Sequence, residues 1–188
     1  MKQLNYIDLF AGAGGLSEGF IRAGFNPIAH VEMNKDACDT IKTRTAFHYL
    51  KDKKKTKIYY DYLKSETKCK EELWRKVPEH LIDSIINKEI SEKTLTEIFE
   101  KIDNELNGRK VDLIIGGPPC QAYSVAGRAR DPHGMKRDQR NFLYKYYVAL
   151  LFIHTPRNLT PVILLLTLIL TPSNEYNYPL PLHSLYLS

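Results

Sequence analysis

Short apolar runs in the first 120 residues of the chain predict the strands of a sheet. They cover residues 4 to 10, 27 to 32, 57 to 60 and 111 to 115. Runs of this length that are rich in Ile, Val and Tyr and bounded by Gly, Pro or Asp are typical of buried strands. Since helical patterns lie between these runs, the chain is expected to fold as an α/β unit.

Between residues 64 and 107 the apolar positions follow a helical period and predict a helical hairpin that leans on the sheet. The spacings of three and four form two sets: Leu81, Ile82, Ile85 and Ile86, then Leu95, Ile98, Phe99, Ile102 and Leu106. Asn107 followed by Gly108 is expected to end the second helix. We interpret both stripes as core, with Trp74 and Val77 extending the packing of the first.

A glycine-rich turn follows the first predicted strand and opens a helix. Glycine permits positive φ and lets a ligand approach the backbone closely. A dinucleotide-binding fingerprint would have glycine three residues after Gly14, but Ser17 stands there, which argues against a nicotinamide cofactor. The next predicted strand ends in Glu32, where a carboxylate can accept both ribose hydroxyls of a nucleoside. The pattern therefore favours a nucleoside cofactor without a pyrophosphate.

A single cysteine, Cys120, follows two prolines at the end of the apolar run 111 to 115. Proline has a locked φ and no N–H, so the pair stiffens the backbone before the sulfur. A thiolate is a strong nucleophile near neutral pH and also a competent leaving group. The alternative is a small buried hydrophobe, which is the default for an arbitrary cysteine. The long and chemically coherent Gly-Gly-Pro-Pro-Cys-Gln stretch favours the nucleophile.

The ordered set Phe-Ala-Gly-Ala-Gly-Gly, Val-Glu-Met-Asn and Pro-Pro-Cys-Gln resembles the motifs of DNA cytosine-5 methyltransferases. The resemblance implies a Rossmann-like S-adenosylmethionine-dependent methyltransferase fold, incomplete here and carrying the inserted hairpin. It also implies that the Cys120 thiolate adds to C6 of a cytosine flipped out of double-stranded DNA, with S-adenosylmethionine methylating C5. A cognate restriction endonuclease acting on the same DNA site would be the natural partner.

The resemblance assigns site residues position by position, with Cys120 as the catalytic residue and no metal. The expected cofactor-binding residues are Phe10, Ala11, Gly12, Gly14, Gly15, Leu16, Glu32, Met33, Asp61, Pro119 and Leu143. The expected nucleic-acid-binding residues are Gln121, Ser124, Arg128, Arg130 and Arg140. Asp61 is assigned because it ends the run 57 to 60, although an Asp after a strand is more often a turn or a helix cap. The basic stretch 128 to 140 is interpreted as a loop over DNA, with a solvated surface loop as its alternative.

Composition agrees with a nucleic-acid partner and with a cytoplasmic location of the protein. The formal net charge is +5 and the three cysteines form no C-x-x-C pair, so neither a metal framework nor a disulfide framework is expected. The lysine run at 51 to 57 is interpreted as a solvated turn. The N-terminus does not resemble a secretory signal, and the apolar run 162 to 170 is too short to span a membrane.

The composition changes at about residue 150. Residues 151 to 188 contain one basic residue, Arg157, and one acidic residue, Glu175. The family would place a Glu-Asn-Val strand end here, whose glutamate protonates cytosine N3, and Glu175 does not match it. We expect residues 1 to 150 to be the N-terminal part of a catalytic domain and residues 151 to 188 to be an aberrant tail that is not a domain. The fourth strand would then have an exposed edge, and the chain alone would transfer no methyl group.

Three alternatives remain open from the sequence. The first is a transfer-RNA cytosine-5 methyltransferase of the same family, which shares Pro-Pro-Cys-Gln. The second is an inactive fragment that binds cofactor or nucleic acid. The third is a nicotinamide dehydrogenase, against which Ser17 argues.

Overall fold

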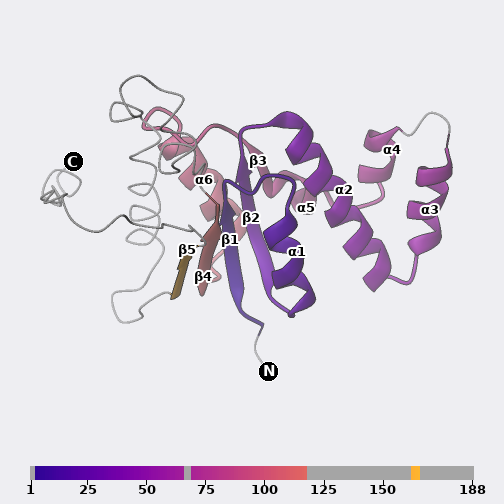
Figure 1. Ribbon diagram of the computed structural model, residues 1–188, viewed down its shortest axis with the longest axis horizontal. Coiled ribbons are helices and arrows are strands. Elements are labelled where there is room, and N and C mark those ends of the chain that lie inside the picture. Colours follow the sequence, from indigo (N-terminus) through magenta and orange to yellow (C-terminus); the bar gives the residue numbers. More distant parts are fainter. Residues whose placement is uncertain (1–2, 66–68, 118–161, 166–188) are drawn as a thin grey trace, which may run out of the picture.

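A computed structural model of the chain describes residues 3–65, 69–117 and 162–165, and a parallel sheet lies at its centre (Figure 1). The sheet has five strands in the order β3-β2-β1-β4-β5. Their bounds are β1 (Asn5–Leu9), β2 (Asn26–Glu32), β3 (Ile85–Asn87), β4 (Leu113–Gly116) and β5 (Val162–Leu165). All pairings are parallel, and β1 lies between β2 and β4. This arrangement confirms the expected α/β methyltransferase type of fold with the first strand in the middle.

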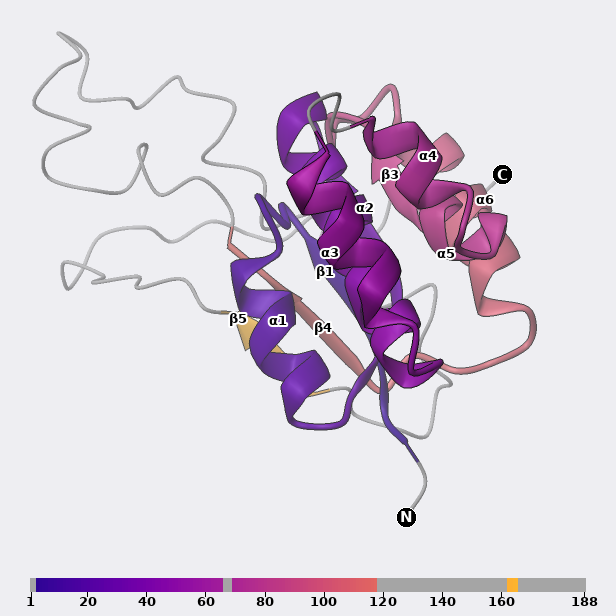
Figure 2. The same ribbon diagram turned by 90° about the vertical axis from the view of Figure 1, so that its right-hand side faces the viewer.

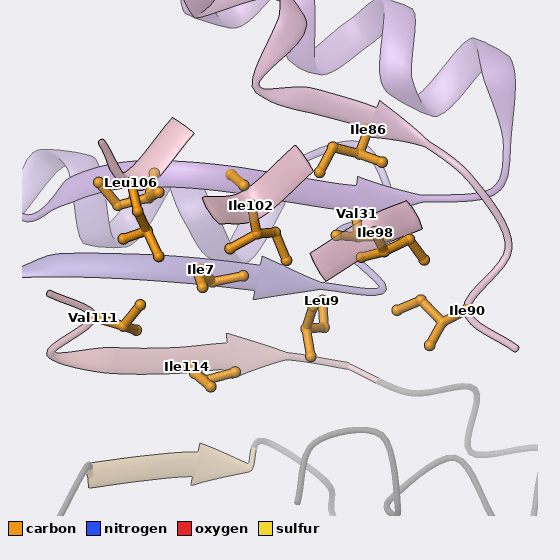
Figure 3. Close-up of a cluster of buried hydrophobic side chains, with 12 residues drawn as sticks. Ile7, Leu9, Val31, Ile86, Ile90, Ile98, Ile102, Leu106, Val111 and Ile114 are labelled. Atoms are coloured by element: carbon orange, nitrogen blue, oxygen red, sulfur yellow. The ribbon is translucent and has the colours of Figure 1, made fainter. Parts of the chain in front are cut away.

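Helices cover both faces of the sheet. On one face lie α1 (Gly15–Arg22) and α2 (Lys35–Asp52), and on the other lies α6 (Leu95–Leu106). The α6 face holds the largest apolar cluster, where Ile98 and Ile102 are fully buried against Ile7 and Leu9 of β1 (Figure 3). Helix α6 ends as its sequence predicts, because Asn107 adopts the left-handed conformation with φ 44°.

The third strand is not where the apolar runs predicted it. Residues 57 to 60 belong to helix α3 (Thr56–Lys64), and Ile85–Asn87 forms the strand. The expectation that Ile85 and Ile86 continue a helix is wrong, because the helix before them, α5 (Glu79–Asp83), ends within five residues. Short apolar runs fit a strand or one side of a helix equally well, so only the packing of their neighbours decides.

The other helices extend the molecule beyond the sheet. Helix α3, α4 (Lys70–Trp74) and the second half of α2 enclose their own apolar cluster around Leu50, Leu73 and Val77. Figures 1 and 2 show α3 as the outermost element on this side. The indole N–H of Trp74 donates to the Thr43 hydroxyl at 3.3 Å and holds α4 on α2. Trp74, Val77, Leu81 and Ile82 pack in this one cluster, as their pattern predicted.

The outer edge of β4 is covered. Strand β5 pairs with it in register from Leu113 with Val162 to Gly116 with Leu165. The expectation that β4 is left with an exposed edge is therefore wrong. Four consecutive apolar residues suit a parallel strand, which is buried on both faces in folds of this kind. Within the described residues, no helix is long and apolar enough to cross a membrane.

Candidate cofactor site

The glycine turn lies at the carboxyl end of β1, between that strand and α1. Phe10, Gly12 and Gly14 have φ values of 56°, 54° and 77°, and the Gly14 N–H closes the turn by donating to the Ala11 carbonyl. A Cβ at Gly12 would meet no atom within 4 Å, so the turn is open on that side. A Cβ at Gly14 would lie 3.3 Å from Ile41 Cγ1 of α2. Gly12 therefore keeps a space beside the turn accessible, and Gly14 allows α2 to pack closely.

Glu32 meets this turn from the end of β2. Its Oε2 accepts the Gly12 N–H at 2.8 Å, and its Oε1 accepts the Asn34 N–H at 2.8 Å. Each carboxylate oxygen still has accepting capacity, because an ionised carboxylate offers about four lone-pair sites. The structure thus brings together two residues that are 20 positions apart and orients a carboxylate beside the open turn.

The remaining predicted cofactor residues in the described part of the chain surround this carboxylate or support it. Met33 is 66% exposed at the rim, where its thioether is free to pack on a flat ring. Ala11 is buried beside Cys38 and Ile41, and Phe10 packs against the apolar cluster under α6. Gly15 begins α1, and Leu16 packs against the side chains of the α1 face. Phe10, Ala11 and Leu16 therefore hold the turn in place from within the core.

Asp61 does not belong to this group by the argument that selected it. It lies in the middle of α3 rather than at the end of a strand, and its carboxylate pairs with Lys57 at 2.7 Å on the exposed surface. Asp61 was assigned to the adenine because it was expected to end a strand, and residues 57 to 60 form no strand. Asn87 is the residue that ends the third strand, and its side chain reaches Glu32 and Met33 through their carbonyls. Sequence reasoning missed Asn87, although a polar residue after Ile85-Ile86 is the signal of a strand that ends there.

A buried polar group lies beneath the turn, on the face covered by α1. The Tyr6 hydroxyl bonds to the Ser17 hydroxyl, which is 2.7 Å from His30 Nε2. Asp8 is in register with His30 on the neighbouring strand, and both are almost completely buried. Neither Asp8 oxygen nor His30 Nδ1 has a hydrogen-bond partner among the described residues. In the sequence alone, Ser17 is distinguished only by its departure from a dinucleotide fingerprint.

Burial sets the protonation of this group. It raises the pKa of Asp8 to about 7, with the nearby Glu32 carboxylate adding to the shift, and it lowers the pKa of His30 to about 4. Burial also raises the pKa of Tyr6 well above its ordinary value. At neutral pH His30 is therefore neutral, and Asp8 keeps its proton to a much higher pH than an ordinary carboxyl group does. A neutral imidazole accepts at one ring nitrogen and donates at the other, so Nε2 accepts the Ser17 hydroxyl proton in one tautomer of His30 and donates to the Ser17 oxygen in the other.

The predicted catalytic and DNA-binding residues lie outside the described residues. They are Cys120, Gln121, Ser124, Arg128, Arg130 and Arg140, and Pro119 and Leu143 of the cofactor set lie there as well. The structure does describe the strand that leads to them. Gly116 at the end of β4 is in register with Leu9, one residue before Phe10. Strand β4, which precedes Cys120 in the sequence, thus ends beside the strand that leads into the glycine turn.

Comparison with known proteins places the chain in a family. The model of the family described as C-5 cytosine-specific DNA methylase matches residues 4–71 and 63–160. The chain belongs to this family of DNA methyltransferases. Within the part of the chain that the structure describes, no group of three or more metal-ligating side chains is found.

Its relatives are bacterial and archaeal type II methyltransferases. The chain is 38% identical over 160 residues to the type II methyltransferase M.Bpa9945I of Bacillus paralicheniformis, covering 75% of this chain and 36% of that protein. It is 31% identical over 155 residues to M1.HphI of Haemophilus parahaemolyticus, covering 82% of this chain and 30% of that protein. It is 33% identical over 151 residues to the putative type II methyltransferase M.MjaORF1200P of Methanocaldococcus jannaschii, covering 71% of this chain and 40% of that protein. The chain therefore spans less than half the length of these relatives.

Proposed function

We propose that the chain serves the methylation of cytosine C5 in double-stranded DNA, with S-adenosylmethionine as the methyl donor. The observation that carries the proposal is the contact between Gly12 and Glu32, which joins two motifs of the family into one open site. The type II names of the relatives support a role in restriction and modification, with a restriction endonuclease of the same DNA specificity as partner. Such a pair would act in the cytoplasm.

The residues present fit the cofactor. Glu32 has a carboxylate held by two backbone N–H groups and able to accept both ribose hydroxyls. Gly12 leaves open space beside the turn, and Met33 offers an exposed apolar side chain to the adenine. Phe10, Gly14, Gly15 and the residues packed behind them keep the turn in its conformation. When bound, S-adenosylmethionine supplies an electrophilic methyl group on a sulfonium.

Cys120 is the proposed nucleophile. Its thiolate forms a bond to C6 of the flipped cytosine, the electron pair of the C5–C6 double bond moves to C5, and C5 becomes the nucleophile that is methylated. A base then takes the C5 proton, the electron pair of that C–H bond re-forms the C5–C6 double bond, and the C6–S bond breaks with its electron pair leaving on the Cys120 thiolate. A cysteine suits both steps because its thiolate attacks well and leaves well. Pro119 would lie against the same base, and Leu143 beside the cofactor.

The DNA contacts are proposed from the residues after the cysteine. Gln121 and Ser124 would bond to the backbone around the gap that the flipped base leaves. Arg128, Arg130 and Arg140 would neutralise phosphates, which dominate the affinity of proteins for DNA. The residues that choose the DNA target sequence are not among the motifs identified in this chain.

Titration of the 188-residue chain with S-adenosylmethionine in a calorimeter tests the cofactor site. Replacing Glu32 by Ala should weaken binding by about 1 to 3 kcal/mol, the range for hydrogen bonds to a charged group. Glu100→Ala removes an exposed carboxylate from α6 on the opposite face and should leave the affinity unchanged. Equal affinity of the Glu32→Ala variant and the unchanged chain would refute the assignment of Glu32.

A chimera tests the nucleophile. Residues 1 to about 150 of this chain would replace the matching part of the Bacillus paralicheniformis relative, and the product would be incubated with DNA containing 5-fluorocytosine. Fluorine at C5 prevents the proton loss that releases sulfur, so Cys120 should remain attached to the DNA. Cys120→Ser should abolish the adduct but keep duplex binding, and an adduct in that variant would place the nucleophile elsewhere. Transfer RNA carrying 5-fluorocytosine distinguishes the RNA alternative.

A further inference from the structure

The side chain of Asn87 forms hydrogen bonds with the backbone at Glu32. Its Nδ2 donates one hydrogen to the Glu32 carbonyl at 3.1 Å and the other to the Met33 carbonyl at 2.9 Å. One exposed amide group therefore holds two consecutive carbonyls at the end of β2. We propose that Asn87 is a positioning residue that orients the Glu32 carboxylate toward the ribose hydroxyls of the cofactor. The inference rests on the proposed function, because the ribose belongs to the proposed cofactor. The hydrogen bonds of Asn87 are independent of that proposal.

The end of β2 needs such support because its neighbour on that side is short. Strand β3 has three residues, and its last pair in register is Glu32 with Asn87. Beyond that pair the Lys88 N–H continues the ladder by bonding to the Glu32 carbonyl at 3.1 Å. The Cys38 thiol also approaches that carbonyl, at 3.3 Å. The Met33 carbonyl lies one residue further on, and the side chain of Asn87 donates to it.

On its other side, the segment 32 to 34 at the end of β2 is held by the Glu32 side chain itself. Its two oxygens accept the Gly12 and Asn34 N–H groups, and the Asn34 side chain in turn accepts the Ala37 N–H at the start of α2. Residues 32 to 34 are thus held from β3 on one side and from the glycine turn on the other. Loosening the β3 side would let the peptide planes rotate and change the direction of the carboxylate. A binding group that is already oriented loses less conformational entropy when the ligand arrives.

The role predicts a loss that depends on the ribose hydroxyls. The probes are S-adenosylhomocysteine and the same compound without its 2′ and 3′ hydroxyls, titrated into the 188-residue chain. Asn87→Ala should weaken binding of the first probe about threefold to tenfold, the scale of one or two neutral hydrogen bonds. Binding of the second probe should change less than twofold, since the carboxylate has no hydroxyl to accept. Asn87→Asp keeps the shape but replaces the donor by an acceptor that faces the two carbonyls, so it should weaken binding of the first probe at least as much as Asn87→Ala does.

A second measurement needs no ligand. Amide hydrogen exchange followed by NMR should be faster at Gly12 and Asn34 in both Asn87 variants, because these two N–H groups bond to the carboxylate that Asn87 orients. The matched control is Asn104→Ala, which removes an exposed asparagine of α6 on the other face of the sheet. It should leave exchange at both amides and the affinity for both probes unchanged.

The two measurements separate the inference from the proposed function. Faster exchange at Gly12 and Asn34 with no difference between the two probes in the unchanged chain would support the positioning of Glu32 and refute the ribose site. Unchanged exchange in both Asn87 variants would overturn the positioning role, whatever the chain binds. An equal loss of affinity for both probes would also overturn the positioning role, because a general disturbance of residues 32 to 34 would then explain the loss.

Discussion

Both faces of the sheet bury apolar side chains, but only the face covered by α1 also has the hydrogen-bonded group of Tyr6, Ser17 and His30 among the described residues. On the face covered by α6, Ile7 and Leu9 of β1 pack against Ile98 and Ile102 in a cluster made of aliphatic side chains (Figure 3). On the face covered by α1, the same strand presents Tyr6 and Asp8. Alternate residues of a strand point to opposite faces, so one five-residue strand serves both environments.

Apolar burial and hydrogen bonds contribute differently to this molecule: the first mainly stabilises the fold, and the second also sets the geometry of the elements that it joins. Aliphatic burial is strong but has no preferred direction, so it holds α6 on the sheet without defining one orientation. The bonds from Tyr6 through Ser17 to His30 are directional and connect β1, α1 and β2 at one point. Because α1 follows directly from the glycine turn, these bonds also hold the turn that we assign to the cofactor.

The largest effect is expected on the aliphatic face. Ile102→Ala should lower the free energy of unfolding by about 2 to 5 kcal/mol, because a fully buried side chain leaves a cavity that neighbours fill only in part. Urea denaturation measures it. Ile102→Val is the control and should cost about 0.5 to 1.5 kcal/mol. A loss under 1 kcal/mol for the alanine variant would show that α6 is not part of the main core.

The next effect concerns Asp8, the buried carboxyl group on the face covered by α1. The pKa of Asp8 is raised to about 7, so between pH 4 and pH 7 the folded chain binds more protons than the unfolded chain at this residue. Its contribution to stability therefore falls as pH rises through that range. Asp8→Asn removes the cost of burying a charge and should stabilise the chain at pH 8, relative to the unchanged chain, by on the order of 2 to 4 kcal/mol.

His30 opposes Asp8 and gives the pH test its control. Its pKa is lowered to about 4, so its contribution to stability rises with pH from about 4 to 6.5. In the unchanged chain the two slopes partly cancel below pH 6.5. In Asp8→Asn the His30 slope should remain, and thermal unfolding from pH 4 to 8 should show stability rising and then levelling. Parallel pH profiles for the two chains would contradict the burial of an ionisable Asp8.

A smaller effect is expected when the polar connection is cut at its middle. Ser17→Ala leaves the Tyr6 hydroxyl and His30 Nε2 buried without this partner and should cost about 1 to 3 kcal/mol. Ser17→Thr keeps the hydroxyl and is the control. The change should also speed amide exchange at Gly12 and Gly14 if these bonds hold the turn. Loss of stability without faster exchange there would mean that the network serves packing only.

The smallest effect is expected away from both faces, on α3. Asp61→Asn removes an exposed pair with Lys57 one helical turn away, and such pairs contribute less than about 0.5 kcal/mol. The affinity for S-adenosylmethionine should not change, and calorimetry measures it. A tenfold loss of affinity would restore Asp61 to the cofactor site and place α3 beside the adenine.

Patterns within a few residues predicted the parts of this chain that depend on local geometry. The spacing from Leu95 to Leu106 predicted α6 and its buried residues, because one face of a helix recurs every three or four positions. Asn107-Gly108 predicted the end of that helix for an equally local reason, the tolerance of both residues for the left-handed conformation. The glycine turn and Glu32 were predicted together because both follow strands that end at the same edge of a parallel sheet.

Other outcomes depended on which segments pack together, and local patterns did not contain that information. Residues 57 to 60 and 85 to 87 are both short apolar runs. Strand β3 forms at the second because it pairs with β2 there, whereas the first lies in α3, where Ile58 and Tyr59 are partly buried in the cluster shared with α2. Val162 to Leu165 joined the sheet because the edge of β4 offered unpaired backbone groups, a long-range pairing that the tail's composition does not reveal. Asn87 and the Ser17 network were likewise decided by tertiary structure, since a hydrogen bond between residues 13 or 55 positions apart exists only once the strands are in register.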